Sequence, residues 1–247
     1  MSMRSSHRTV WYLAIPLTSA VLVMTVTLLL SQRSTTAEPA YPAMNHTLLV
    51  QGKHWSLKTE EVENHVAAGL YLDSHDQATL EDYAQAVQRY KAAAFATHNT
   101  IPALVTFRHP IAPESFPKLM TAAGATVESF TIRTIEPDGR RGTMGGAPEP
   151  DGTILDVNHV AALSDLQAKN LGAPVQVAGV IDAEVIVDRA AFEQLSAQTN
   201  DVFLVDIMRA VAFDHLPAAM KDRVSMKSVY LKPIYWYLED NQMTSGA

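Results

Sequence analysis

The longest uninterrupted hydrophobic stretch of the chain lies near its N-terminus. No charged residue occurs from Val10 to Leu30, and about 20 apolar residues in a helix span the hydrocarbon core of a bilayer. Arg4 and Arg8 precede this stretch and Arg33 follows it, before any acidic residue appears. Because basic residues collect on the cytoplasmic side, we expect residues 1–9 to be cytoplasmic and residues 10–30 to form a single transmembrane anchor.

A cleaved signal peptide is the alternative interpretation of the same stretch. The small residues Thr35, Thr36 and Ala37 follow it and are typical of a cleavage site. The stretch is longer than the usual signal-peptide core of about 7 to 15 residues, and Arg33 stands directly after it, so an uncleaved anchor is favoured. Both interpretations place residues 40–247 outside the cytoplasm.

A linker and a helical segment are expected next. Residues 31–47 are rich in Ser, Thr, Pro and Ala and show no hydrophobic periodicity, as in a linker. Residues 48–100 are expected to form a helical layer, with the strongest helical spacing from Thr79 to Thr97. Thr79 begins a sequence that resembles a capping box, with Asp82 in place of Glu. One apolar face of this helix would carry Leu80, Tyr83, Ala84, Val87, Tyr90, Ala94 and Phe95.

A first β-α-β pattern follows this helix. The strand-like run Pro102–Phe107 precedes a helical segment, Pro113–Ala123, whose apolar residues recur on one face. Gly124 is a helix stop, because glycine adopts the left-handed conformation that ends many helices. Val127–Ile135 then has the composition of a second strand.

A second β-α-β pattern has the same order. A strand is expected over Val177–Val187, followed by Asp188 as the N-cap of a short helix. Phe192 and Leu195 would face inward from that helix, and Val202–Ile207 would form the last strand. Two such units predict an α+β fold of the split βαβ, ferredoxin-like class over residues 101–210, with both helices on one face of an antiparallel sheet.

The second unit, GVIDAEVIVDRAAFEQLSAQTNDVFLVDI, also resembles the closing half of the propeptide-inhibitor domain of subtilisin-type proteases. The resemblance rests on a helix of the form A-x-x-x-L, here Ala191–Leu195, and on a strand of the form V-x-x-V-D/E, here Val202–Asp206. It implies a ferredoxin-like fold and the inhibition of a subtilisin-like protease. The long insertion over residues 136–176 departs from the pattern of that family.

This insertion contains the candidate interaction site. It begins with EPDGRRGTMGGAPEPDGT, whose Gly, Pro and Asp residues predict a mobile loop or an extended hairpin. A short helix over Asn158–Asn170 is expected to follow, with Val160, Leu163 and Leu166 inward. The candidate contact residues of the loop are Asp138, Arg140, Arg141 and Met144.

The C-terminal segment 211–247 is expected to add one strand and a docking segment. Residues 224–238 combine β-branched and aromatic side chains, and Pro233 interrupts them. Because aromatic side chains bury large areas, we expect this cluster to pack in the core rather than form an exposed recognition patch. Its members are Tyr230, Tyr235, Trp236 and Tyr237.

Residue spacing gives no support to a metal site or a catalytic site. The chain has nine histidines and no cysteine, and no histidine pair has the i, i+4 spacing of a helical zinc motif. Asp73 and Asp76 are better explained as acids near a helix N-terminus than as cation ligands. The chain contains neither the G-x-S-x-G pattern of a nucleophile elbow nor a glycine-rich phosphate loop. We therefore predict no catalytic residue, no metal ligand and no cofactor.

The distribution of charge limits the partners. All 26 acidic residues follow the anchor, where they outnumber the basic ones, so nucleic acid is excluded as a partner. We expect a membrane-anchored bacterial protein whose extracytoplasmic domain senses or binds a protein or peptide, through the 136–157 loop or by strand addition at a sheet edge. The alternatives are a metal-dependent hydrolase of the cell envelope and an inhibitor of a subtilisin-like protease.

Overall fold

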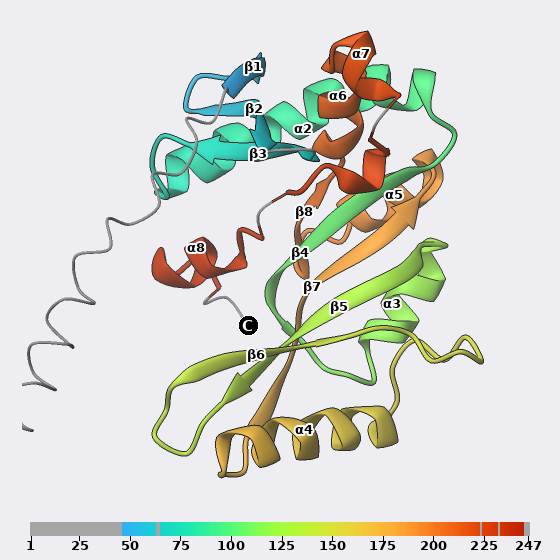
Figure 1. The fold of residues 1–247 in the computed structure, drawn as a ribbon. Helices are drawn as coiled ribbons and strands as arrows, with labels where there is room; N and C mark the ends of the chain where they lie inside the picture. Colours follow the sequence, from blue (N-terminus) through green and yellow to red (C-terminus); the bar gives the residue numbers. More distant parts are fainter. Residues whose placement is uncertain (1–45, 63–64, 223, 232, 245–247) are drawn as a thin grey trace, which may run out of the picture. The chain divides into compact units, whose positions relative to one another are not determined.

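The computed structural model describes residues 46–62, 65–222, 224–231 and 233–244. The chain divides into two compact units, Met1–Ala43 and Met44–Ala247, and the described residues all belong to the second. The predicted cytoplasmic segment 1–9, the anchor 10–30 and most of the linker 31–47 lie outside them. Within the described part of the chain, no helix is long and apolar enough to cross a membrane. The described unit is an α+β fold with antiparallel sheets and packed helices (Figure 1).

The first sheet is a three-stranded antiparallel meander of β1 (His46–Gln51), β2 (Trp55–Val62) and β3 (His65–Leu72). The expected helical layer over residues 48–100 is therefore wrong for its first half. The reason is the hydrophobic period: Trp55, Leu57 and Thr59 are all buried, which is the period of two that places alternate residues on one face of a strand.

The second half of that layer is helical, as predicted. Helix α2 (Gln77–Thr97) begins two residues before Thr79, because the side chain of Asp76 accepts a hydrogen bond of 2.8 Å from the Thr79 N–H. Asp76 is thus the N-cap, and the proposed capping box at Thr79 is wrong. Leu80, Tyr83 and Val87 are fully buried, which confirms the predicted apolar face.

The second sheet has five strands in the order β6-β5-β7-β4-β8, and every neighbouring pair is antiparallel. Both predicted β-α-β patterns are confirmed. The first consists of β4 (Ile101–Ile111), α3 (Phe116–Ala123) and β5 (Thr126–Ile135). The second consists of β7 (Gln176–Val187), α5 (Arg189–Ser196) and β8 (Val202–Asp206).

The predicted helix ends in these two units are also confirmed. Gly124 ends α3 with a φ of 73°, in the left-handed region that glycine adopts without strain. Asp188 caps α5, since its carboxylate accepts a hydrogen bond of 2.7 Å from the Ala191 N–H. Phe192 and Leu195 face inward from α5 and are fully buried.

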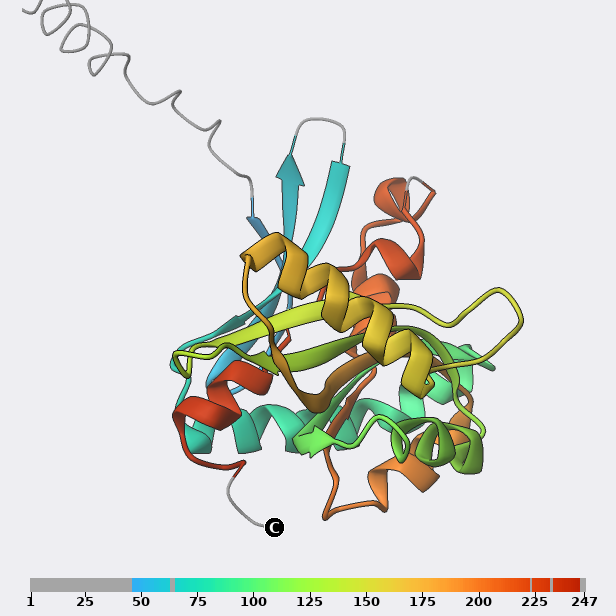
Figure 2. The same ribbon diagram turned by 90° about the horizontal axis from the view of Figure 1, so that it is seen from below.

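The insertion between the two units is ordered into a strand and a helix. β6 (Arg141–Gly146) pairs with β5, so the expected extended hairpin is present. Helix α4 (Val157–Leu171) follows the predicted bounds closely and lies across this hairpin (Figure 2). Val160 and Leu163 pack against the core, but Leu166 is 57% exposed and does not face inward as expected.

The C-terminal segment is helical where a strand was expected. It contains α6 (Met208–His215), α7 (Ala218–Lys221), the 3-10 turn Met226–Ser228 and α8 (Tyr235–Asp240). None of the described residues between 224 and 238 is in a strand. Pro233 lacks the N–H that a sheet ladder needs and is tolerated just before a helix, which explains why α8 forms after it.

The two faces of the five-stranded sheet differ. Helices α3 and α5 pack on one face, where Phe116 of α3 contacts Phe107 of β4 and Phe130 of β5 at ring-centroid distances of 6.0 and 5.6 Å. Ala183, the register partner of Phe130, lies on this face. Its chain neighbours Asp182 and Glu184 therefore point to the opposite face, on the side where Figure 1 shows α8.

Candidate functional site

A cleft of about 350 Å³ opens between β3 and the segment that leads into α8. β3 is an edge strand of the three-stranded sheet, and an edge strand presents backbone N–H and C=O groups away from its only partner. A volume of this size is at the lower end for ligand sites, about 300 to 1,000 Å³. The described lining residues are Gly69, Leu70, Tyr71, Leu72, His75, Tyr230, Ile234 and Tyr237.

The β3 wall of the cleft is fixed by packing on α2. Leu72 pairs across the sheet with Trp55, and Trp55 is buried against Tyr83 of α2 with the two rings edge to face at 5.4 Å. Leu70 is buried on the same side. Tyr71, the next residue along the strand, points to the other face of the sheet, where the Lys58 ammonium lies 5.1 Å from its ring.

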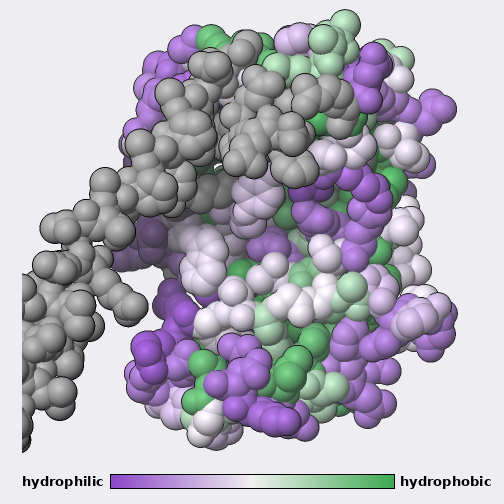
Figure 3. Space-filling model, viewed as in Figure 1, coloured by the Kyte–Doolittle hydropathy of each residue, from purple (hydrophilic) through white to green (hydrophobic). Residues whose placement is uncertain are grey.

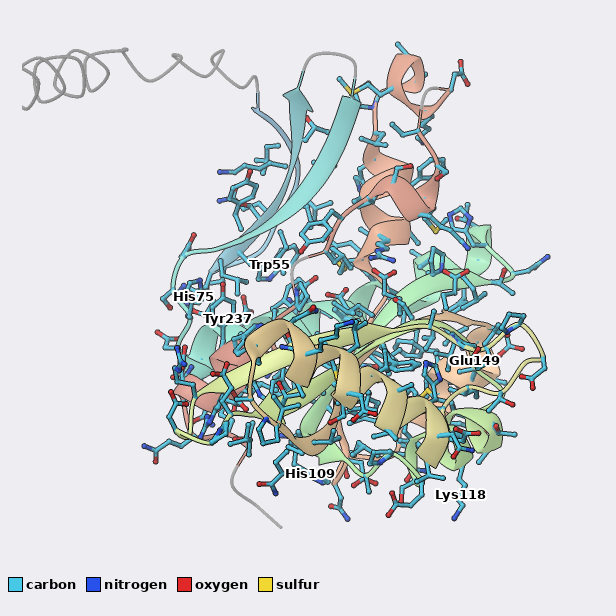
Figure 4. All side chains as sticks on the ribbon, turned by 60° about the horizontal axis from the view of Figure 1, so that its bottom comes forward. Trp55, His75, His109, Lys118, Glu149 and Tyr237 are labelled. Carbon is cyan, nitrogen blue, oxygen red and sulfur yellow. The ribbon has the colours of Figure 1, made fainter. Side chains whose placement is uncertain are left out.

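The opposite wall is aromatic and contacts the turn after β3. Tyr237 stacks on His75 with ring centroids 3.7 Å apart and planes at 12°, and Figure 4 shows the two side chains together near Trp55. Asn241 donates hydrogen bonds to the backbone carbonyls of His75 and Tyr237. Tyr230 is 59% exposed at the rim. The expected core packing is thus confirmed for Tyr235, which is buried, and is wrong for Tyr230 and for Trp236, which is 39% exposed.

Helix α8 is held on the five-stranded sheet by a buried arginine. Arg133 of β5 is only 2% exposed, and its Nε donates a hydrogen bond of 3.1 Å to Glu239 of α8. Its guanidinium lies 3.9 Å from the centroid of the Trp236 ring and 5.5 Å from that of Tyr235. Burial, and then the Glu239 carboxylate, raises the pKa of Tyr235 well above its ordinary value. This cluster positions the wall that carries Tyr237.

A second set of charged side chains links the five-stranded sheet to helices α2 and α6. Asp206 accepts hydrogen bonds from the Tyr83 hydroxyl at 2.7 Å and from the Met208 N–H at 2.9 Å. Burial raises the pKa of Asp206 to about 6, and it also raises the pKa of Asp182 to about 6. Arg209 of α6 pairs with Glu184, next but one to Asp182 on β7. The contacts of Asp206 and Glu184 tie α2 and α6 to the sheet.

The predicted interaction residues do not form one exposed surface. Asp138 and Arg140 pair with each other in the turn between β5 and β6 at 2.7 Å, and the Arg140 N–H, followed by the Arg140 side chain, holds the pKa of Asp138 below its usual value. Arg141 lies 3.5 Å from Glu239, so it belongs to the α8 contact. Met144 is buried opposite Ile132. Met144 is therefore a core residue, and its assignment as a surface contact is wrong.

Three histidines of the described region pair with three different carboxylates. His98 pairs with Asp214 at 2.9 Å, His109 with Asp201 at 3.2 Å and His159 with Glu149 at 3.5 Å. His109 lines a second depression of about 540 Å³ together with Lys118, and Figure 4 shows both far from His75. Among the described residues, no group of three or more His, Cys, Asp or Glu has a metal-binding arrangement.

On the face shown in Figure 3, hydrophobic residues occur in small groups between hydrophilic ones and form no broad apolar area. The sequence singled out Tyr230 and Tyr237 as an aromatic cluster but missed Tyr71 and His75. Leu70 and Leu72, two positions apart, were the available signal for a strand beside them.

Comparison with known proteins found no relative of this chain. The chain matches no known family model, and no match was found among curated proteins or solved structures.

Proposed function

We propose that the chain is a membrane-anchored, extracytoplasmic binding module that holds an extended peptide segment of a partner protein and catalyses no reaction on it. The membrane assignment is supported by the uncharged stretch 10–30 and its flanking arginines. A reporter enzyme fused after Ala247 tests the topology. We expect activity when the reporter requires export, and activity confined to the cytoplasm would contradict the proposal.

The observation that carries the binding function is the cleft between the edge strand β3 and the aromatic segment 230–237. Outward backbone groups of an edge strand can bind the main chain of an extended peptide. Tyrosine provides a large contact area at a low cost in conformational entropy, and it also offers a hydroxyl group. An exposed tyrosine at the rim of an apolar cleft is therefore suited to bind an extended peptide.

A selection on the full chain tests this function. A displayed library of random 12-residue peptides is selected on the wild type, and each clone is then tested on Tyr230→Ala and on Leu166→Ala. Both residues are more than half exposed, so neither substitution should disturb folding, and Leu166 lies on α4 outside the cleft. We expect clones that lose binding on Tyr230→Ala and keep it on Leu166→Ala. The proposal fails when no recovered clone depends on Tyr230.

Inhibition of a subtilisin-like protease is the second candidate, and the strand order favours it. We infer that the five-stranded sheet has a ferredoxin-like core, because β4, β5, β7 and β8 follow one another along the sheet as β8-β4-β7-β5, all antiparallel, with α3 and α5 packed together. An inhibition assay against a subtilisin-type protease separates the two candidates. Inhibition that survives Tyr230→Ala would favour this second function over the cleft.

A further inference from the structure

We propose that two copies of this chain pair edge to edge through β6, so that their five-stranded sheets join into one continuous antiparallel sheet. β6 is an outer strand of the larger sheet, whereas the cleft lies beside the smaller one. The contact between copies is therefore independent of the peptide-binding function proposed above. It is supported by the free backbone groups of β6, the small side chains along it and the charges at its two ends.

Alternate backbone groups of β6 point away from its own sheet. β5 is its only neighbour in that sheet, and their antiparallel register has no bulge. Directly beyond this ladder, the Glu136 N–H donates a hydrogen bond of 2.8 Å to the Arg140 carbonyl. Bonded and non-bonded pairs alternate in an antiparallel ladder, so the even-numbered residues of β6 bond to β5. The N–H and C=O groups of Arg141, Thr143 and Gly145 therefore point to the outer edge.

Helices cover both faces of β6 but not this edge. α4 lies on the face that carries Phe130, since a Cβ atom placed on Gly146 would meet Phe130 and Leu163. On the opposite face, Arg141 contacts Glu239 of α8. Figure 1 shows β6 in front of the other strands of its sheet, with no labelled helix or strand in front of it. An uncovered strand edge is a template for pairing with another chain.

The side chains along this edge allow a second backbone to approach. Three of the residues from 142 to 146 are glycines, and Thr143 is short. A Cβ atom at Gly145 would meet no atom within 4 Å, so space is open beside the strand. Many proteins protect their sheet edges with lysine, proline or a bulge. Residues 142–146 contain none of these devices.

The charges at the ends of β6 favour a second copy that runs antiparallel to the first. Arg141 begins the strand and is 61% exposed, and Glu149 follows the strand and is 49% exposed. An antiparallel copy brings the start of one strand beside the end of the other, so each Arg141 lies near the Glu149 of the other copy. A parallel copy would place like charges side by side. Two-fold symmetry, the commonest symmetry of homo-oligomers, forms the favourable pair twice.

The register that uses the most free backbone groups places Thr143 opposite Gly145 of the other copy. Its two-fold axis passes beside Met144, near the middle of β6. Arg141 then lies opposite Ala147, and each opposed pair of outward residues can exchange its N–H and C=O hydrogen bonds. Glu149 is the diagonal neighbour of Arg141 in this register, within reach of two long side chains.

A single introduced cysteine tests the contact, because the chain contains no cysteine of its own. The full chain with Gly145→Cys is treated with a short bismaleimide in extracts of the expressing cells, and cross-linked dimer is measured on a denaturing gel. The two copies of residue 145 are diagonal neighbours in the proposed register, about 7 to 8 Å apart, so we expect at least about fivefold more dimer than from Arg189→Cys. Arg189 is exposed on α5, which packs on β8 at the opposite edge of the sheet.

A second position tests the direction of pairing. Ala147 is exposed and lies directly after β6. Antiparallel pairing separates the two copies of residue 147 by about six residues along the strand, roughly 20 Å. Ala147→Cys should therefore give no more dimer than Arg189→Cys. Equal cross-linking at positions 145 and 147 would overturn the antiparallel arrangement.

Two substitutions added to Gly145→Cys test the hydrogen bonds and the charges. Thr143→Pro removes an outward N–H, and an edge strand tolerates proline at such a position; Thr143→Val keeps the N–H and is its control. Glu149→Lys places a positive charge near Arg141 of the other copy, with Glu149→Gln as its control. Thr143→Pro and Glu149→Lys should each lower the dimer yield at least about fivefold, and the controls should stay within about twofold.

The contrary results are equally specific. A dimer yield from Gly145→Cys that equals that from Arg189→Cys would mean random collision and would overturn the proposal. A Thr143→Pro chain that keeps the wild-type urea midpoint and still cross-links fully would exclude hydrogen-bonded pairing through β6. Cross-linking that is unchanged by Glu149→Lys would exclude the contact between Arg141 and Glu149 and, with it, the proposed register.

Discussion

The two faces of the five-stranded sheet are covered by helices in different ways. On the first face, α3 and α5 pack through apolar and aromatic side chains such as Phe116 and Phe192, both fully buried. On the second side, α6 and α8 also bury apolar residues such as Val211 and Leu238, but they are attached in addition through Arg209 and Arg133, which pair with Glu184 and Glu239. Apolar packing is non-directional, whereas a buried ion pair requires one geometry. The second face therefore fixes the position of α8, and with it one wall of the cleft.

The largest expected effect is on the apolar face. Phe116→Ala removes a fully buried ring that packs edge to face on Phe107 and Phe130. The lost burial and the cavity should lower the free energy of unfolding by about 3 to 5 kcal/mol. Urea denaturation of the full chain measures the change, with Leu166→Ala as a control expected to stay within about 0.5 kcal/mol. A loss below about 1 kcal/mol would mean that this face does not dominate stability.

Arg133→Ala should have a somewhat smaller effect on stability and an additional effect on the cleft. It leaves Glu239, which is 10% exposed, without its buried partner and removes the cation–π contact with Trp236. We expect a loss of about 2 to 4 kcal/mol. Because α8 then loses its attachment, binding of the selected peptides should also weaken. Unchanged peptide binding in a folded Arg133→Ala protein would show that this cluster does not position the cleft.

Lowering the pH tests how two buried carboxyls on the second face contribute to the free energy of unfolding. The pKa values of Asp182 and Asp206 are raised by burial from 3.8 to about 6, so in the folded state each carboxyl binds its proton at a higher pH than when unfolded. Their contribution to stability is full below the unfolded pKa and is lost as the pH rises through about 6. Between pH 7.5 and pH 5 the free energy of unfolding should therefore rise by about 1 kcal/mol for each carboxyl.

Matched variants identify these two carboxyls as the cause. Asp182→Asn should remove about half of the rise, and Asp206→Asn the other half, in urea titrations at both pH values. Phe116→Ala, on the apolar face, should leave the rise unchanged. A stability that falls between pH 7.5 and pH 5 in the wild type would contradict the raised pKa values.

The same contrast explains what the sequence could and could not predict. The first face was predictable, because Phe192 and Leu195 recur with the helical period and Asp188 and Gly124 mark helix ends. The pairing of Arg133 with Glu239 was not predictable, because the two residues are far apart in the chain and periodicity reports only local structure. Met144 was assigned to a loop because glycines surround it, yet β6 pairs with β5 and buries it. Residues 48–72 were predicted from a helical period and not from the period of a strand. For this reason β3 and the cleft beside it were not predicted.

The smallest expected effect on stability comes from a substitution at Arg141. It distinguishes the contribution of burial from that of charge at the Glu239 carboxylate. Arg141 also contacts Glu239, at 3.5 Å, but it is 61% exposed, whereas Arg133 is 2% exposed. Water screens the exposed pair, and ordering a long exposed side chain costs entropy, so Arg141→Ala should change the free energy of unfolding by less than about 0.5 kcal/mol. Urea denaturation of the two arginine variants side by side gives the comparison. Both arginines bind the same acid, so a large difference would come from the burial, the hydrogen bonds and the ring contacts of Arg133, whereas similar losses would show that the buried position of Arg133 adds nothing to the attachment of α8.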